Sequence, residues 1–189
     1  MAANSLSEAL EAFFPASVLS NPGASCKEKR KSISFRKEPG DIVHCLELKE
    51  AIKEWKDWPQ GTPSCDCLFV CGQEGRDEFL VLFAELKGDD TEKALAQLQA
   101  TAGVFCKQSS QPFLGAGHGR AGLSAKGCRA THGKVVLAAI VSKSGGRVAS
   151  SWQDERKRLR NHNIKLLDRQ ASATELTVST LFNAANRIR

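Results

Sequence analysis

Two long apolar runs in the middle of the chain predict a buried β-hairpin. Residues 65–71 (CDCLFVC) and 79–86 (FLVLFAEL) are almost continuously apolar, and the polar residues 72–78 between them suit a turn. Residues 42–48 predict a further strand before the hairpin. Strands that are apolar on both faces need cover on both sides, so we expect a mixed sheet flanked by helices in an α/β fold.

Three capping boxes predict helices around these strands. Residues 5–8 open a short helix that ends at Pro15, residues 89–92 open one that continues to Phe105, and residues 172–175 open the last. Each capping box is followed by apolar residues at helical spacing. We therefore expect each of these helices to pack one face against the sheet.

The remaining segments complete a single domain over residues 1–189. Residues 1–39 hold the first helix and a basic connection, whose residues 21–39 are expected to form a solvated loop, and residues 40–105 form the core. Residues 106–133 are rich in Gly and Ser and predict a long loop. Residues 134–189 supply the C-terminal strands (134–141 and 164–167) and the last helix.

Composition fits this interpretation. The chain has 189 residues, of which 41% are hydrophobic and 25% charged, which excludes collagen-like and wholly disordered proteins. Its 27 Lys and Arg against 21 Asp and Glu give a formal charge of +6, which permits phosphate binding without demonstrating it. No stretch is long and apolar enough to span a bilayer, and residues 1–20 lack the features of a secretory signal, so we expect no membrane partner.

The cysteines predict a reducing compartment. Four of the seven, Cys45, Cys65, Cys67 and Cys71, fall in expected strands, as is typical of buried thiols in cytoplasmic proteins. On a strand, Cys65, Cys67 and Cys71 would share one face, where a zinc site is an alternative to core packing. No second cysteine pair or HxxxH follows at zinc-site spacing, so core packing is favoured.

Charged residues at the ends of the hairpin strands are the candidate site. Glu85 and Lys87 are two residues apart and therefore share a face, and Asp66 on the preceding strand lies beside them in a suitable register. Unpaired charge in such apolar surroundings is costly, so the group calls for an explanation. Two carboxylates suit a hard cation such as Mg²⁺, which would activate water and polarise a phosphodiester oxygen beside the Lys87 ammonium.

These residues resemble the PD-(D/E)xK nuclease superfamily, which includes many restriction endonucleases, junction resolvases and repair exonucleases. The resemblance covers residues 41–105 and the strand 134–141, more loosely the first helix, and is nearest to small bacterial members of the superfamily. It implies a restriction-endonuclease-like αβββαβ core. Cys65 stands where the family name has proline.

The resemblance also implies roles for individual residues. Asp66 and Glu85 would bind Mg²⁺ or Mn²⁺, with the Leu86 carbonyl as a possible third ligand, and Lys87 would be the catalytic lysine. Gln97 matches a helix position that contacts metal-bound water or substrate in several branches. The acidic residue of the first helix would be Glu8 or Glu11, and the sequence does not choose between them.

Each of these residues also has a structural interpretation. Glu85 and Lys87 would form a neutralised ion pair, Asp66 would cap a strand end or turn, and Gln97 would be a surface helix residue. A local echo of the motif, Glu47-Leu-Lys49, precedes a charged run that is expected to be solvated, and we reject it as a site. His118 and His132 are interpreted as loop residues.

Peripheral basic residues are candidates for contact with nucleic acid, although such charge runs are more often solvated faces. They are Lys31, Arg36, Arg156, Arg158 and Arg160.

The expected function is Mg²⁺- or Mn²⁺-dependent cleavage of DNA in the cytoplasm, in a phage-defence, restriction or mobile-element system as the resemblance implies. The alternative is a catalytically inactive nuclease-fold subunit that binds nucleic acid or protein. A chain of this length has little surface beyond the core, and specific duplex interfaces bury about 1,000–2,500 Å² of protein, so we expect a homodimer or a partner protein.

Overall fold

A computed structural model of the chain describes residues 24–28, 31–54, 58–74, 78–86, 91–107, 120–123, 131–140, 165–169 and 173–186. The predicted first helix with Glu8 and Glu11 lies outside these residues, as do His118 and the basic residues Arg156, Arg158 and Arg160. Lys87 also lies outside them, two positions beyond the end of a described strand.

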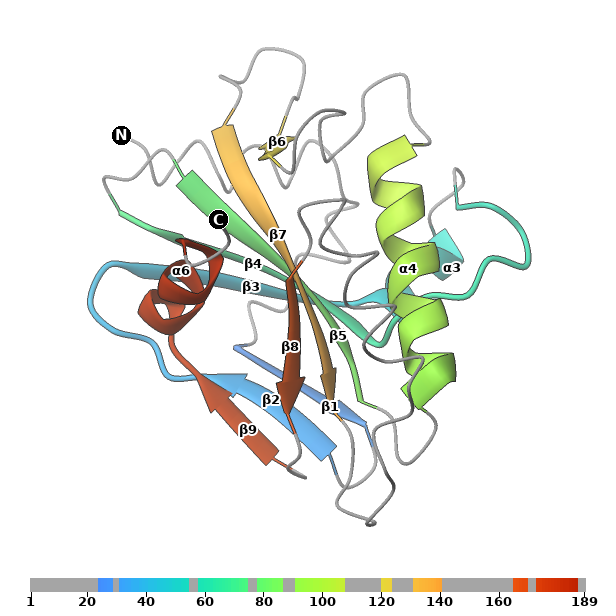
Figure 1. Cartoon of the computed structure of the whole chain (residues 1–189), viewed down its shortest axis with the longest axis horizontal. Helices are drawn as coiled ribbons and strands as arrows, with labels where there is room; N and C mark the ends of the chain where they lie inside the picture. Colours follow the sequence, from blue (N-terminus) through green and yellow to red (C-terminus); the bar gives the residue numbers. More distant parts are fainter. Residues whose placement is uncertain are drawn as a thin grey trace.

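The central sheet is mixed and contains the predicted hairpin (Figure 1). Its strands are β3 (Asp41–Glu47), β4 (Cys67–Gln73), β5 (Glu78–Glu85), β7 (Thr131–Ile140), β6 (Arg120–Leu123) and β8 (Lys165–Arg169). β3, β4 and β5 form an antiparallel meander, and β7 pairs with β5 in parallel. β6 and β8 pair with different parts of β7, β6 antiparallel and β8 parallel.

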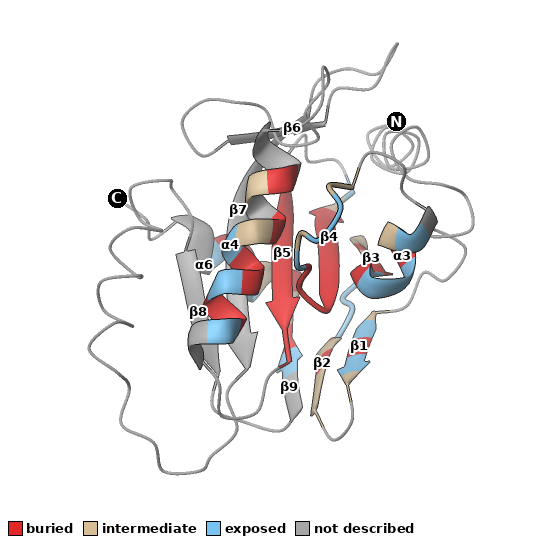
Figure 2. Cartoon of the chain, turned by 90° about the vertical axis from the view of Figure 1, so that its right-hand side faces the viewer, coloured by how far each residue is buried: buried red, intermediate tan, exposed pale blue. Residues whose placement is uncertain are grey.

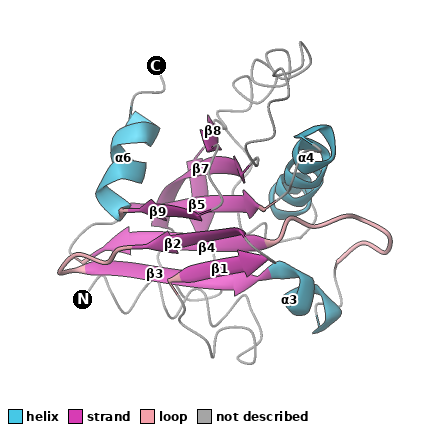
Figure 3. Cartoon of the chain, turned by 90° about the horizontal axis from the view of Figure 1, so that it is seen from below, coloured by secondary structure: helices cyan, strands magenta, loops and turns pink. Residues whose placement is uncertain are grey.

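Two helices follow strands of this sheet. α4 (Thr91–Lys107) connects β5 to the parallel strand β7 through β6, as a crossover helix does in an α/β protein. α3 (Leu48–Glu54) is a two-turn helix that begins directly after β3. Both helices lie beside the same end of the β3–β4–β5 meander, where β3 and β5 end and β4 begins (Figures 1 and 3).

A second, three-stranded sheet joins early and late parts of the chain. β1 (Ser25–Glu28) and β2 (Lys31–Phe35) form an antiparallel hairpin, and β9 (Ala173–Leu176) pairs with β2 in parallel. α6 (Val178–Asn186) follows β9 directly. The described chain is therefore an α/β structure with two sheets and three helices.

The core explains why the meander strands are apolar on both faces. One face packs against the second sheet and α6 through residues such as Phe69, Leu82, Ile33 and Leu181. α4 lies against β5 and β7, and its buried residues include Leu98 and others on the side that faces the sheet. Figure 2 shows β4 and β5 buried along most of their length, and α4 exposed on its outer side.

The structure corrects the expected loop at residues 21–39. Within it, β1 and β2 bury Cys26, Ile33 and Phe35. Ile33 and Phe35 have the two-residue spacing of a strand, but the Lys and Arg residues around them hide this short pattern. The expected loop at 106–133 likewise contains the strand β6 and the first residues of β7, so His132 lies on a strand and not in a loop.

The last helix starts later than predicted. Residues 173–176 form β9, so the capping box at residues 172–175 is not the start of the helix. Thr177 caps it instead, because its Oγ1 accepts a hydrogen bond from the Thr180 N–H at 3.1 Å. None of the described helices is long and apolar enough to span a membrane.

Candidate functional site

Asp66 and Glu85 meet where β4 begins and β5 ends. The hairpin register pairs Cys67 with Ala84, so the next pair along is Asp66 and Glu85. The Asp66 N–H donates to Glu85 Oε2 at 3.1 Å, and the Leu86 N–H donates to Asp66 Oδ2 at 2.7 Å. Each carboxylate is therefore held by the backbone of the opposite strand.

Both carboxylates are taken out of bulk solvent. Asp66 is 4% exposed and Glu85 is fully buried. The first residue of α3, directly after β3, completes the row, because the Leu48 N–H donates to the Asp66 carbonyl oxygen at 3.0 Å. Backbone contacts from both neighbouring chain segments thus fix the position of Asp66.

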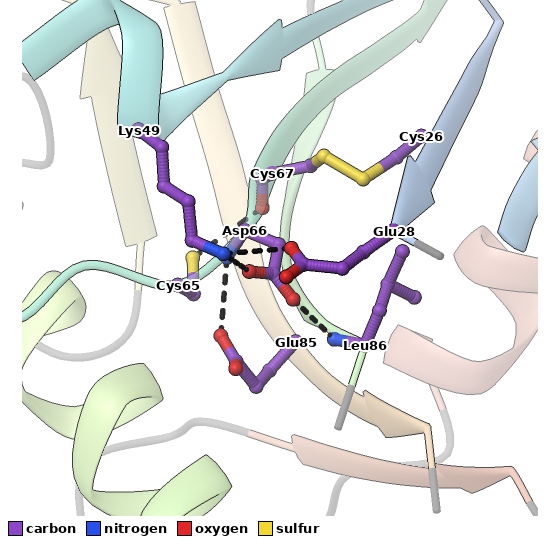
Figure 4. Close-up of a disulfide and its surroundings, with 8 residues drawn as sticks. All are labelled: Cys26, Glu28, Lys49, Cys65, Asp66, Cys67, Glu85 and Leu86. Atoms are coloured by element: carbon purple, nitrogen blue, oxygen red, sulfur yellow. Dashed lines mark hydrogen bonds and ion pairs between the residues drawn. A yellow bond between two sulfur atoms is a disulfide. The ribbon is translucent and has the colours of Figure 1, made fainter. Parts of the chain in front are cut away.

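Lys49, which the sequence interpretation rejected, contacts this row directly. Its Nζ lies 2.6 Å from Asp66 Oδ1 and 2.7 Å from Glu28 Oε2 (Figure 4). The charged run that was expected to be solvated forms α3. Two residues of this helix, Leu48 and Ala51, are buried. α3 brings Lys49 to the Asp66 carboxylate, and β1 brings Glu28.

These contacts shift the pKa values of the two paired groups. Burial alone would raise the pKa of Asp66, but the hydrogen bonds from Lys49 and the Leu86 N–H outweigh it and hold the pKa below its ordinary value. Burial would lower the pKa of Lys49, and its bonds to Asp66 and Glu28 outweigh it and raise the pKa. Asp66 is therefore ionised, and Lys49 protonated, at neutral pH.

Gln97 supports the segment before Asp66 from α4. Its Nε2 donates to the Ser64 carbonyl oxygen at 2.8 Å, while its Oε1 has no hydrogen-bond partner in the described part of the chain. One turn later, Thr101 Oγ1 accepts the Cys65 N–H at 2.8 Å and donates to the Gln97 carbonyl oxygen at 2.8 Å. Gln97 is 8% exposed, so it is not a surface residue.

The cysteines differ from the expected set of reduced thiols. Cys67 forms a disulfide with Cys26, with their Cα atoms 6.3 Å apart, which links β1 to β4 (Figure 4). Cys45, Cys65 and Cys71 are free and buried, and burial raises their pKa values, that of Cys45 to about 12. Cys65 precedes β4 instead of lying on it with Cys67 and Cys71.

The disulfide removes the three-thiol zinc alternative, because Cys67 has no thiol to offer. In the described part of the chain no group of three His, Cys, Asp or Glu side chains is arranged to hold a metal ion. Asp66 and Glu85 supply two carboxylates, and Mg²⁺ commonly takes one or two from the protein and completes its shell with water and substrate. The donor chemistry of the pair thus fits Mg²⁺ or Mn²⁺.

No family model, curated protein or solved structure matches this chain.

The remaining residues of the predicted site and of the predicted DNA contacts lie in different parts of the chain. Leu86 contacts the site through its N–H, and the role of its carbonyl oxygen stays a prediction. Lys31 begins β2, and Arg36 directly follows it with an exposed side chain. Lys87 stays a prediction.

Two site residues escaped prediction for different reasons. Lys49 carried a signal, since Leu46-Glu-Leu-Lys49 echoes Ala84-Glu-Leu-Lys87 at the end of another strand of the same sheet. Glu28 carried none, because only the pairing of the β1–β2 hairpin and the disulfide bring it near Asp66.

Proposed function

We propose that this protein is a metal-dependent nuclease that hydrolyses phosphodiester bonds of DNA, with Asp66 and Glu85 as its metal-binding carboxylates. The observation that carries the proposal is the buried pair itself. Two acidic side chains are held by opposite strands at one end of a sheet, in surroundings where burial penalises their charge. Buried acids of this kind are typical of functional sites.

The order of the elements agrees with the proposed restriction-endonuclease-like core. β3, β4 and β5 form an antiparallel meander, α4 follows, and β7 returns parallel to β5. The acids stand at the start of the second strand and the end of the third, as the resemblance to the PD-(D/E)xK superfamily requires. The first helix of that core would come from the N-terminal residues.

Two carboxylates gather at this position. Asp66 and Glu85 lie at one end of the sheet, beside the ammonium of Lys49. Such a carboxylate pair suits a hard divalent ion, which fits Mg²⁺ or Mn²⁺. When bound, such an ion lowers the pKa of a coordinated water and polarises a phosphodiester oxygen.

The side chains then have separate tasks. Asp66 and Glu85 would hold the ion, and the backbone N–H groups that fix them keep the carboxylates in place without rearrangement. Lys87, two residues beyond Glu85, would orient the attacking water or offset charge that develops on the phosphate. Gln97 fixes the chain before Asp66 through the Ser64 carbonyl.

Duplex DNA is the proposed substrate, with Lys31, Arg36 and the basic residues 156–160 as contacts to its phosphates. A homodimer or a partner protein would complete the interface with the duplex. The proposed setting is a defence, restriction or mobile-element system.

Cleavage of plasmid and oligonucleotide DNA in Mg²⁺ and Mn²⁺ tests the proposal. We expect cleavage by the native protein, which EDTA abolishes, and a loss of at least about 100-fold in Asp66→Asn, Glu85→Gln and Lys87→Ala. Glu50→Gln is the matched control, because Glu50 is exposed and forms an ion pair with Lys53 on the same helix. Equal cleavage by all the proteins, or none by any, would contradict a nuclease.

Binding of DNA without cleavage would instead support the inactive nuclease-fold subunit. Native protein that retains DNA in a gel-shift assay in Mg²⁺, and leaves it intact, would be that result.

A further inference from the structure

We propose that Lys49 occupies the metal-binding oxygen of Asp66 when no metal is bound, and that an incoming divalent cation displaces it onto Glu28. Lys49 is then a positioning residue that sets the affinity of the site for metal. The inference rests on the proposed function, since it takes Asp66 as a metal ligand.

The two oxygens of Asp66 have partners of different kinds. Oδ2 accepts the backbone N–H of Leu86 at 2.7 Å, and this donor cannot leave without disrupting the end of the hairpin. Oδ1 contacts Lys49 Nζ at 2.6 Å, which is a side-chain partner. A cation therefore enters most easily at Oδ1, the oxygen whose partner can move.

Solvent exposure shows which groups can move. The Lys49 side chain is 45% exposed and the Glu28 side chain 30%, whereas that of Asp66 is 3% exposed. Lys49 is attached to a two-turn helix at the edge of the site and can swing its four-carbon stem without changing the backbone. Asp66 stays in place while its counter-cation changes.

Glu28 offers Lys49 a second position. Its Oε2 already lies 2.7 Å from Lys49 Nζ, so the ammonium can give up Asp66 and keep one ion pair. Glu28 is itself tethered, because Cys26, two residues before it, is bonded to Cys67, the neighbour of Asp66 (Figure 4). Repulsion between the ammonium and a divalent ion on one oxygen drives the exchange.

Calorimetric titration of the full-length protein with Mn²⁺ tests the proposal. Lys49→Met removes the competing cation and should tighten Mn²⁺ binding by about tenfold, within the range usual for charges in contact. Lys49→Arg keeps the charge and should stay within about twofold of native. Lys53→Met, on the same helix but paired with exposed Glu50, controls for the general loss of one positive charge.

A double-mutant cycle tests the part assigned to Glu28. Glu28→Gln should weaken Mn²⁺ binding by about threefold or more in the native protein, because the displaced Lys49 then has no second partner. The same change in the Lys49→Met background should alter the affinity by less than about twofold. Thermal unfolding of each variant without metal shows that it is folded.

Two results would overturn the proposal. Mn²⁺ binding by Lys49→Met that is no tighter than that of Lys53→Met overturns the proposal, including the case where neither native nor variant binds. An equal loss on Glu28→Gln in both backgrounds makes Glu28 a direct ligand and also overturns it.

The proposed function fails separately. It does so if Asp66→Asn leaves Mn²⁺ binding or DNA cleavage at the native level, whatever Lys49→Met does.

Discussion

The two oxygens of the Asp66 carboxylate have partners of different kinds, a backbone N–H at Oδ2 and an ammonium in an ion pair at Oδ1, and this division is the basis of the site. The Leu86 backbone fixes one oxygen, and the Lys49 ammonium neutralises the other. Together they hold the pKa of Asp66 down although burial raises it. A buried carboxylate that stays charged in this way is a ready ligand for a hard cation.

Thr101 is expected to be essential for the segment that carries Asp66. Thr101→Val removes the oxygen that accepts the Cys65 N–H and leaves a buried donor unsatisfied, which should cost about 1–3 kcal/mol in the free energy of unfolding. Thr101→Ser keeps the hydroxyl and should lose less than Thr101→Val, about 1 kcal/mol, because only a buried methyl group is removed. Urea unfolding of the three proteins measures this, and a loss in Thr101→Ser as large as that in Thr101→Val would refute the expected order.

The buried thiol of Cys45 should make the protein less stable at alkaline pH. Burial, and secondarily the charge of Glu47, raises the pKa of Cys45 from 9.0 to about 12. Above pH 9 the unfolded chain releases this proton while the folded chain retains it, so stability falls as the pH rises towards 12.

The measurement is the free energy of unfolding in urea at pH 8 and at pH 10. Native protein should lose more stability between the two than Cys45→Ala, which has no thiol at this position. A loss of the same size in both proteins would show that other groups cause it.

The site was partly predictable at this scale. Asp66 and Glu85 could be brought together from the sequence because one lies at the start and the other at the end of two apolar strands joined by a short polar turn, which limits the possible registers. The contact of Lys49 with Asp66 could not be predicted, because a lysine in a charged run looks solvated until the preceding strand, β3, is placed beside β4. Glu28 depends on a contact between two sheets, which has no local pattern.

At the scale of elements, the Cys26–Cys67 disulfide ties the second sheet to the first. The crosslinked residues are 41 positions apart, so the bond restricts a large loop of the unfolded chain. It also keeps β1, and with it Glu28, close to the candidate site.

Reduction of this bond should therefore destabilise the protein. Dithiothreitol is expected to lower the free energy of unfolding of the native protein by about 2–4 kcal/mol. Cys26→Ala with Cys67→Ala should have the lower stability from the start and should not respond to the reductant. A native protein that is equally stable with and without dithiothreitol would contradict the crosslink.

Elements with long, strongly apolar patterns were predicted well, and short ones were not. The hairpin of β4 and β5, the helix α4 and the strand β7 follow from their sequences within a few residues. β1, β2 and β9 have four or five residues each; β1 and β2 form a local hairpin, and β2 pairs with β9 across the length of the chain. The β2–β9 pairing and the packing of this sheet are tertiary contacts that no short sequence window contains.

At the scale of the whole molecule, the charge of +6 stands in contrast to the acidic site. Carboxylates gather where a cation would bind, while basic residues such as Arg36 lie exposed elsewhere. This division is what a metal-dependent nuclease needs, with acids for the ion and peripheral cations for the phosphates.

DNA binding by the uncleaving Asp66→Asn protein should accordingly weaken with salt. Each phosphate contact contributes about −0.9 to the slope of log affinity against log salt concentration. Adding Arg36→Ala should make the slope shallower by about that amount, while Lys53→Ala, paired within α3, should leave it unchanged. Fluorescence anisotropy with a labelled duplex gives both slopes, and an unchanged slope in the Arg36 variant would remove this residue from the interface.

The most direct test of the account is the initial rate at which supercoiled plasmid is cleaved in Mg²⁺ by native protein, Asp66→Asn and Glu50→Gln, purified in parallel. We predict equal rates for native protein and Glu50→Gln, both abolished by EDTA, and a rate for Asp66→Asn at least about 100-fold lower. Cleavage by Asp66→Asn at the native rate, or no cleavage by the native protein, would contradict the account.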